Sequence, residues 1–268
     1  MDSATYWSTM GPVFGTNTNT QRNVLLEDFT GHRCNNCPTA TDTAEAIREE
    51  NVGQVFVATI HASPIGTATF QEVILPDFST DWTNADGLGI GLHFGNLPGS
   101  QFIGNPLGTI NRVRFNGQLM QSEGLWRNIT ESLLSAPLRV NIQADVNYFP
   151  NTRGMFVHAE VDIIDPGIPN DMYTVVYLVE DTAVGSQLLS DNSLEPDYVH
   201  KNIMRDCILS GWEGLPVNSI FQVAPSKFRY DYIYELPNQY DVSNMHLLIY
   251  VRDAVTEEIY QVIKQEIL

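Results

Sequence analysis

The sequence predicts an α/β plus all-β fold, in which an N-terminal α/β half precedes a C-terminal antiparallel β-sandwich. A strand, a helix and a second strand follow one another between Val24 and Ile60, which is the order of a βαβ unit. Helical spacing of apolar residues stops at residues 135–137, and beyond them apolar and polar residues alternate with a period of two. With 268 residues, the chain is also longer than one core usually supports.

The first βαβ unit can be placed residue by residue. A strand is predicted at Val24–Phe29 and is ended by Thr30-Gly31. Pro38 suits the first turn of a helix, because it lacks the amide hydrogen that has no partner there, and the helix should run to Glu50. The β-branched apolar run Val55–Ile60 is typical of a parallel strand that is covered on both faces.

The rest of the N-terminal half is less regular. Residues 62–101 are rich in Pro, Gly, Asp and Thr and are predicted to be an insertion, with short helical turns near 68–73. Asn116-Gly117, between the apolar runs Thr109–Val113 and Gln118–Met120, predicts a hairpin turn. Apolar residues at helical spacing predict an amphipathic helix over Glu123–Ser135.

The predicted domains are a flexible N-terminal segment at 1–21, an α/β domain at 22–136 and a β-sandwich domain at 137–268. Short strands separated by Pro, Gly and Asn turns favour a sandwich of the immunoglobulin or fibronectin kind. Tyr198–Leu209 is expected to be a helical or irregular crossover. The strands of this half are predicted at Val140–Val146, Met155–Ile164, Tyr173–Glu180, His246–Arg252 and Glu258–Ile267.

Charge and hydropathy exclude several classes of protein. The chain has 14 Lys and Arg against 32 Asp and Glu, a formal charge of −18, which argues against binding to nucleic acid or to an anionic membrane surface. Hydrophobic residues make up 43% of the chain, too many for a disordered protein. No apolar stretch is long enough to predict a transmembrane segment. The N-terminus shows no leader peptide, and we interpret the chain as mature or trimmed.

The chemistry is concentrated in a C-x-x-C pair, Cys34 and Cys37. A strand delivers Cys34 to the start of a helix, where unpaired amides and the helix dipole favour the thiolate. Cys34 is therefore the expected nucleophile, and Cys37 is placed to resolve a mixed disulfide. His32 and Arg33 would add positive charge that lowers the pKa of the Cys34 thiol further.

At this point the residues resemble the thioredoxin superfamily. Asp28-Phe29 stand six residues before Cys34, as a buried Asp-Phe pair does in thioredoxins. The resemblance implies that Asp28 exchanges a proton with Cys37. It also implies a cis-proline beside the disulfide, where neighbouring backbone binds extended substrates. Pro106, preceded by Asn105, is the expected position, and Pro98 is the alternative.

Within that superfamily, residues 24–38, with Asn111-Arg112 after the later proline, resemble the outer-membrane-protein-28-related family of Bacteroidota. The resemblance implies a thioredoxin-like domain joined to a C-terminal β-sandwich. It also implies an extracytoplasmic location in the periplasm or outer membrane, with a lipid anchor upstream of Met1.

Two functions remain open. One is thiol-disulfide exchange with a protein or peptide partner in the cell envelope, which the β-sandwich recruits. The other is a non-catalytic binding or structural module with a static disulfide.

Alternatives exist for most of these residues. The cysteines could form a structural disulfide, or bind zinc with His32 and His61, although a structural zinc site needs four ligands and the sequence lacks a second C-x-x-C. Asp28 could be a solvent-facing strand residue. Cys207 is expected to be a quiet buried thiol. Neither a metal nor a cofactor is expected. Gly87–Leu92 matches no phosphate-binding pattern and is expected to be a flexible loop.

Overall fold

The computed structural model of the protein describes residues 11–168 and 171–268. Its N-terminal half contains the strands β1 (Val24–Thr30), β2 (Val55–His61) and β3 (Leu107–Ile110) and the helices α2 (Cys37–Glu50), α3 (Ala85–Asn96) and α4 (Glu123–Leu134). The βαβ unit and the last helix of this half lie where the sequence predicts them. The C-terminal half contains β4 (Val140–Phe149), β5 (Gly154–Ile163), β6 (Met172–Leu188), β7 (Leu194–Cys207), β8 (Leu215–Pro216), β9 (Phe221–Ala224), β10 (Lys227–Glu235), β11 (Met245–Asp253) and β12 (Ile259–Glu266).

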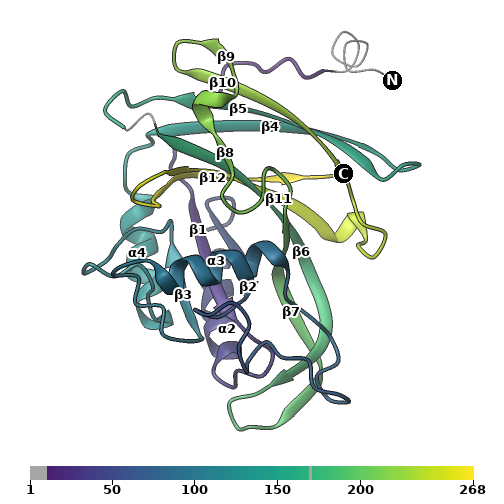
Figure 1. The fold of residues 1–268 in the computed structure, drawn as a ribbon. Helices are drawn as coiled ribbons and strands as arrows, with labels where there is room; N and C mark the ends of the chain where they lie inside the picture. Colours follow the sequence, from purple (N-terminus) through teal and green to yellow (C-terminus); the bar gives the residue numbers. More distant parts are fainter. Residues whose placement is uncertain (1–10, 169–170) are drawn as a thin grey trace.

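The strands form two sheets, so the fold is mixed α/β with mostly β structure. The larger sheet has the order β12-β11-β6-β7-β2-β1-β3, with β8 paired to β6, and the smaller has the order β4-β5-β10-β9. Strands β1 and β2 are parallel, whereas β3 runs antiparallel to β1. In Figure 1 the smaller sheet lies across the top of the molecule, and the helices lie below it around β1, β2 and β3.

The larger sheet crosses the predicted domain boundary at residue 137. Strand β2 pairs with β7 through Thr59 and Ile203, so the strands of the first half continue into those of the second. Three buried clusters fill the structure. One lies between α2, α4 and one face of β1 and β2, another covers the opposite face with α3, and the third lies between the smaller sheet and β6, β11 and β12.

Two predicted segments are corrected by the structure. Residues 198–207, expected to be a helical or irregular crossover, belong to strand β7, because β7 pairs antiparallel with β6 along most of its length. Gly87–Leu92 lies within helix α3 and is not a flexible loop. Asn84 caps this helix by accepting a hydrogen bond from the Gly87 amide at 2.8 Å, and Ile90 and Phe94 bury its apolar side.

The N-terminal segment 1–21, predicted to be flexible, lies partly outside the described residues. Its described part, residues 11–21, has no regular secondary structure but runs along β4. Asn17 donates to the Ile142 carbonyl oxygen at 2.9 Å, and Asn141 donates to the Asn19 carbonyl oxygen at 3.0 Å. The predicted turn at Asn116-Gly117 is present, with positive φ at both residues and a bridge between Phe115 and Gln118.

Candidate functional site

Cys34 and Cys37 form a disulfide at the carboxyl end of β1. The S–S distance is 2.12 Å and the Cα atoms are 5.4 Å apart. Cys34 lies in the loop that follows β1, and Cys37 is the first residue of α2, with Pro38 in the first turn of the helix. Once the disulfide is reduced, both sulfur atoms would lie by the positive end of α2, which stabilises a thiolate.

Asp28 of β1 has a fully buried side chain that contacts α2, the helix that begins at Cys37. One carboxylate oxygen accepts a hydrogen bond from Thr41 Oγ1 at 2.9 Å, while the other, Oδ1, has no partner among the described residues. Thr41 is one turn after Cys37 on the same face of α2, so the carboxyl group is close to the second cysteine. Burial raises the pKa of Asp28 to about 7. The alternative of a solvent-facing Asp28 is therefore wrong.

The two residues before Cys34 differ in the charge they supply. His32 is buried, and the burial lowers its pKa, so its ring is neutral at neutral pH and adds no positive charge. This corrects the expectation that His32 helps to stabilise the thiolate through its charge. Arg33 is partly exposed and forms an ion pair with Glu72 at 3.1 Å, which offsets part of its field.

The peptide bond between Asn105 and Pro106 is cis, which agrees with the choice of Pro106 over Pro98. Strand β3 begins directly after Pro106, and the pairing of Leu107 with Phe29 places the proline beside the end of β1. The Asn105 side chain donates to the Ala62 carbonyl oxygen at 2.9 Å and accepts from Gln71 at 3.2 Å. Hydrogen bonds to residues of the insertion therefore fix the position of the Asn105 side chain.

Two segments cover the disulfide. The insertion contributes the Phe70 carbonyl oxygen, which accepts from the Arg33 amide at 3.1 Å, and the Glu72 carbonyl oxygen, 2.9 Å from His32 Nε2. The tip of the β6–β7 hairpin contributes Gln187, whose Nε2 donates to the Cys34 carbonyl oxygen at 3.0 Å. Cys34 and Cys37 consequently retain only 2% and 1% of their accessible surface.

A cluster of aromatic and histidine side chains lies at the carboxyl end of β2. The His61 ring stacks on Trp82 with centroids 5.7 Å apart, and His200 of β7 packs against Trp82 at 4.2 Å. His61 is buried, and neither ring nitrogen has a hydrogen-bond partner among the described residues. Burial lowers the pKa of His61 well below its usual value and that of His200 to about 4, so both rings are neutral at neutral pH.

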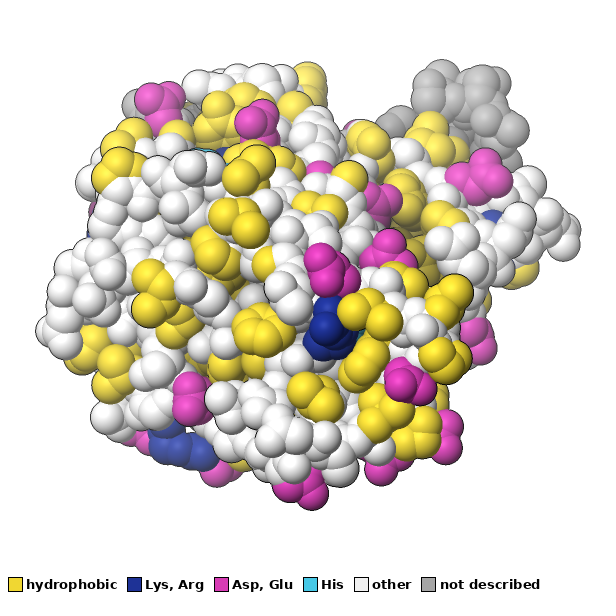
Figure 2. All heavy atoms as spheres, turned by 60° about the horizontal axis from the view of Figure 1, so that its bottom comes forward, with side chains coloured by type: hydrophobic (Ala, Val, Ile, Leu, Met, Phe, Trp, Pro, Cys, Tyr) yellow, Lys and Arg dark blue, Asp and Glu magenta, His cyan; other side chains and the backbone are white. Residues whose placement is uncertain are grey.

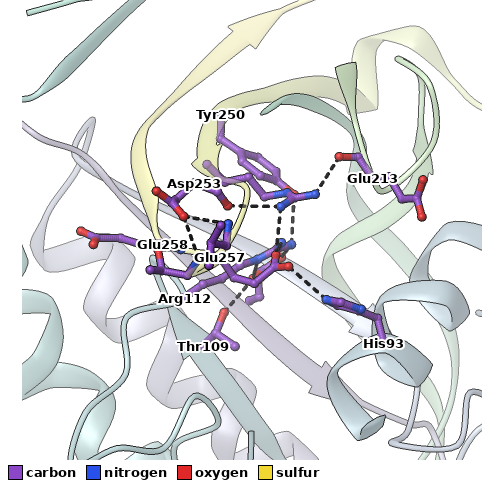
Figure 3. Close-up of polar contacts among 12 residues, drawn as sticks. His93, Thr109, Arg112, Glu213, Tyr250, Asp253, Glu257 and Glu258 are labelled. Atoms are coloured by element: carbon purple, nitrogen blue, oxygen red, sulfur yellow. Dashed lines mark hydrogen bonds and ion pairs between the residues drawn. The ribbon is translucent and has the colours of Figure 1, made fainter. Parts of the chain in front are cut away.

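A buried network of polar side chains around Arg112 connects the strands of the N-terminal half to those of the C-terminal half. Figure 3 shows Arg112 surrounded by side chains that come from several strands. The guanidinium donates to Glu27 at 2.7 and 2.8 Å and to the hydroxyls of Tyr177 and Tyr250 at 2.9 and 3.0 Å. Its Nη1 also lies 3.3 Å from Glu257 Oε2, and Glu257 Oε1 accepts a hydrogen bond from Nε2 of His93 in α3 at 3.0 Å. These contacts join β1, β6, β11 and α3.

The structure thus gathers some predicted site residues and not others. Cys34, Cys37, Asp28, His32, Arg33, Asn105 and Pro106 all lie around the end of β1. Cys207 is buried in the core on the α3 side, and burial raises the pKa of its thiol. Gln187 and Asn192 of the hairpin tip, which contact the C-x-x-C loop, were missed because they are more than 150 residues away along the chain.

Within residues 11–168 and 171–268, no group of three or more His, Cys, Asp or Glu side chains is arranged to hold a metal ion. In the same part of the chain, no helix is both long and apolar enough to cross a membrane.

Comparison with known proteins decides the family. The model of the family described as outer membrane protein Omp28 matches residues 100–268. The chain belongs to the Omp28 family. This Omp28 family member is therefore extracytoplasmic, in the periplasm or at the outer membrane, as the sequence resemblance implied. No curated protein matches the chain.

Two solved structures, HBP35 and a protein from Agrobacterium tumefaciens, share the fold of this Omp28 family member at low sequence identity. HBP35 of Porphyromonas gingivalis matches with a TM-score of 0.69 and 14% identity, over 93% of this chain and 76% of that one. A protein from Agrobacterium tumefaciens matches with a TM-score of 0.56 and 11% identity, over 91% and 94% of the two chains. A domain of the outer membrane lipoprotein Omp28 from P. gingivalis has 20% identity and a TM-score of 0.32, over 48% of this chain and 88% of that one.

Proposed function

We propose that this protein carries out thiol-disulfide exchange in the cell envelope, with Cys34 as the sulfur that meets the partner and Cys37 as the resolving thiol. The observation that carries the proposal is the Asp28 carboxyl group. It is fully buried and accepts a hydrogen bond from Thr41, one helical turn after Cys37, with Oδ1 unpartnered among the described residues and a pKa of about 7. A buried carboxyl group with one hydrogen bond is costly to a fold, whereas a pKa near neutrality suits a proton donor and acceptor.

The thiol-disulfide exchange needs no cofactor, because the partner and the protein together account for every electron and proton. A partner thiolate attacks Cys34 Sγ, the Cys34–Cys37 bond breaks, and its electron pair leaves on Cys37 Sγ, which takes the proton of the Asp28 carboxyl group. A second thiolate of the partner then attacks the partner's sulfur in the mixed disulfide and releases Cys34. The partner dithiol is oxidised to a disulfide and the protein is reduced by two electrons. In the reverse direction, Asp28 accepts the proton of Cys37 as that thiol attacks.

Residues 137–268 would then serve to recruit the partner, which would be a protein or peptide that carries a thiol or disulfide. We propose that they form a β-sandwich of the immunoglobulin or fibronectin kind. The packing of the smaller sheet on β6, β11 and β12 supports this arrangement. The division into domains at 22–136 and 137–268 stays a prediction, since the larger sheet contains strands from both. A lipid anchor upstream of the chain likewise stays a prediction.

A static disulfide is the second candidate function, and the burial of both cysteines favours it. In that case the protein would be a binding or structural module of the envelope, and the disulfide would only tie the end of β1 to α2.

The equilibrium reduction potential of the pair distinguishes these functions. The full chain with Cys207→Ala, which leaves only the two cysteines of interest, is equilibrated in glutathione buffers, and free thiols are counted by mass spectrometry after alkylation. A transition above about −230 mV indicates an oxidase or isomerase, and one near about −270 mV a reductant. A potential below about −300 mV contradicts exchange and supports the static module. Asp28→Asn tests the proton transfer, since it should flatten the pH dependence of the exchange rate around pH 7.

A further inference from the structure

The tip of the β6–β7 hairpin is held on the C-x-x-C loop by three hydrogen bonds. The Leu188 amide donates to the His32 carbonyl oxygen at 2.8 Å, and Gln187 Nε2 donates to the Cys34 carbonyl oxygen at 3.0 Å. Asn35 Nδ2 donates to Asn192 Oδ1 at 3.0 Å. The Gln187 side chain is itself only 3% exposed, so its hydrogen bond to the Cys34 carbonyl oxygen is buried. In Figure 1 this hairpin reaches down past the larger sheet to the lower end of the molecule.

The outer part of the hairpin has little support from the rest of the sheet. Strand β11 pairs with β6 only as far as Glu180, and β2 pairs with β7 only at Ile203. Beyond these residues, within the described part of the chain, the two strands pair with each other alone. A two-stranded ribbon is marginally stable in water, and segments of this kind open locally without global unfolding.

The ribbon also has a point at which it can bend. The β6–β7 register shifts between Gly185 and Gln187, directly before the residues that cover the disulfide. Gly185 packs against Trp82, where an added Cβ would lie 2.5 Å from the indole, so the ribbon is held up to this residue. The three bonds to the C-x-x-C loop all lie on the far side of the shift. The part that can lift is therefore short, comprising residues 187–192.

The insertion is attached to the same loop more firmly. Gln71 is buried and donates to the Thr30 carbonyl oxygen at 2.7 Å, while Arg33 donates to the Thr69 carbonyl oxygen at 2.7 Å. These contacts add to those of Phe70 and Glu72. Of the two segments over the disulfide, the hairpin tip thus has fewer contacts to break. Figure 2, which turns this lower end forward, shows hydrophobic side chains scattered over the surface, with acidic side chains between them and few basic ones.

We propose that residues 187–192 form an autoinhibitory cover, which must lift from the C-x-x-C loop before a partner thiol can reach Cys34. This regulation rests on the proposed exchange function. The cover keeps the disulfide unreactive in the closed protein, and lifting it leaves the rest of the fold in place. The rate of exchange is then set by how often the tip opens.

The test measures the rate at which dithiothreitol reduces the Cys34–Cys37 disulfide. The parent protein is the full chain with Cys207→Ala, and variants of the hairpin tip are compared with it. Gln187→Ala with Asn192→Ala removes two of the three bonds, and the reduction rate should rise by about tenfold or more, since each bond restrains the closed state by several-fold. Gln265→Ala is the matched control, because Gln265 also donates to a backbone carbonyl oxygen but lies on β12, and it should leave the rate unchanged. Reduction is followed by alkylation and mass spectrometry.

Two outcomes overturn the proposal. One is an unchanged rate in the double variant. The other is a faster rate that depends as steeply on sub-denaturing urea as global unfolding does, because the disulfide would then be reached through the unfolded chain. Failure of the proposed function gives a different result: the variant is reduced rapidly by dithiothreitol but exchanges with no protein disulfide, and its reduction potential is that of a structural bridge.

Discussion

Arg112 and Glu27 are joined by two hydrogen bonds, from Nε to Oε2 at 2.8 Å and from Nη2 to Oε1 at 2.7 Å, and neither side chain is exposed to solvent. Burial opposes ionisation of the carboxyl group, but the guanidinium beside it keeps the pKa of Glu27 below its usual value. The pair lies where strands from both halves of the chain meet. Through its hydrogen bonds to Tyr177 of β6 and Tyr250 of β11, it joins β1 to the C-terminal strands.

Removing one member of this pair should destabilise the whole protein. Arg112→Met leaves the Glu27 carboxylate buried without its cation, and the free energy of unfolding should fall by about 3–5 kcal/mol. Arg127→Met is the matched control, because its ion pair with Glu50 is exposed and should contribute at most about 1 kcal/mol. Urea denaturation at pH 7 measures both. Equal losses in the two variants would contradict the structural role of Arg112.

Asp28→Asn should stabilise the oxidised protein in a pH-dependent way. The pKa of Asp28 is raised in the folded state, so the folded protein binds more protons than the unfolded chain between about pH 4 and pH 7, and stability falls as pH rises through this range. A shift from 3.8 to about 7 corresponds to about 4 kcal/mol. The gain from Asp28→Asn should therefore approach that value at pH 8 and disappear near pH 4. Asp42→Asn, at an exposed position of α2, should show no such trend.

His200 should contribute to loss of stability in acid. Burial lowers its pKa to about 4, so the unfolded chain takes up the proton first as pH falls below about 6.5, and unfolding becomes more favourable. The stabilisation of His200→Gln relative to the wild type should increase as pH falls from 7 to 4, by about 3 kcal/mol in total. Chemical denaturation at a series of pH values measures the difference. A constant difference would show that His200 titrates normally.

Gly91→Ala tests the close contact between α3 and the loop after β2. An added Cβ would lie 2.6 Å from the Ser63 carbonyl oxygen and 2.8 Å from Ala62 Cβ, so the helix would have to move away. The expected loss is about 1–3 kcal/mol, with a change in the environment of the adjacent His61 ring observable by NMR. Gly124→Ala in α4 is the control, because nothing lies within 4 Å of its added Cβ, and it should be neutral or stabilising.

Local patterns in the sequence predicted much of the N-terminal half. The run Val24–Phe29, Pro38 after the second cysteine and the Asn116-Gly117 turn each have a physical preference that a few neighbouring residues determine. The cis bond before Pro106 came from the superfamily resemblance, as did the burial of Asp28. These features depend on short-range spacing or on a known fold, and the structure contains them.

Features that depend on distant residues were missed. Residues 198–207 contain charged and apolar side chains without clear alternation, and they become a strand only because β6 and β2 lie on either side. Nothing in the composition of Gln187 or Asn192 indicates that they contact Cys34 and Asn35. The neutral state of His32 likewise follows from burial under residues 70–78, which the local sequence does not reveal.

Because the larger sheet contains strands from both halves of the chain, it cannot form completely until the C-terminal strands have been synthesised. During synthesis, β1 and β2 leave the ribosome long before their neighbours β7 and β12 exist. The Asn23 amide, for example, donates to a Gln261 side chain that is 238 residues away. Until then, β2 presents an open edge that can pair with another nascent chain. The N-terminal half therefore completes its part of the sheet only after the C-terminal strands are available.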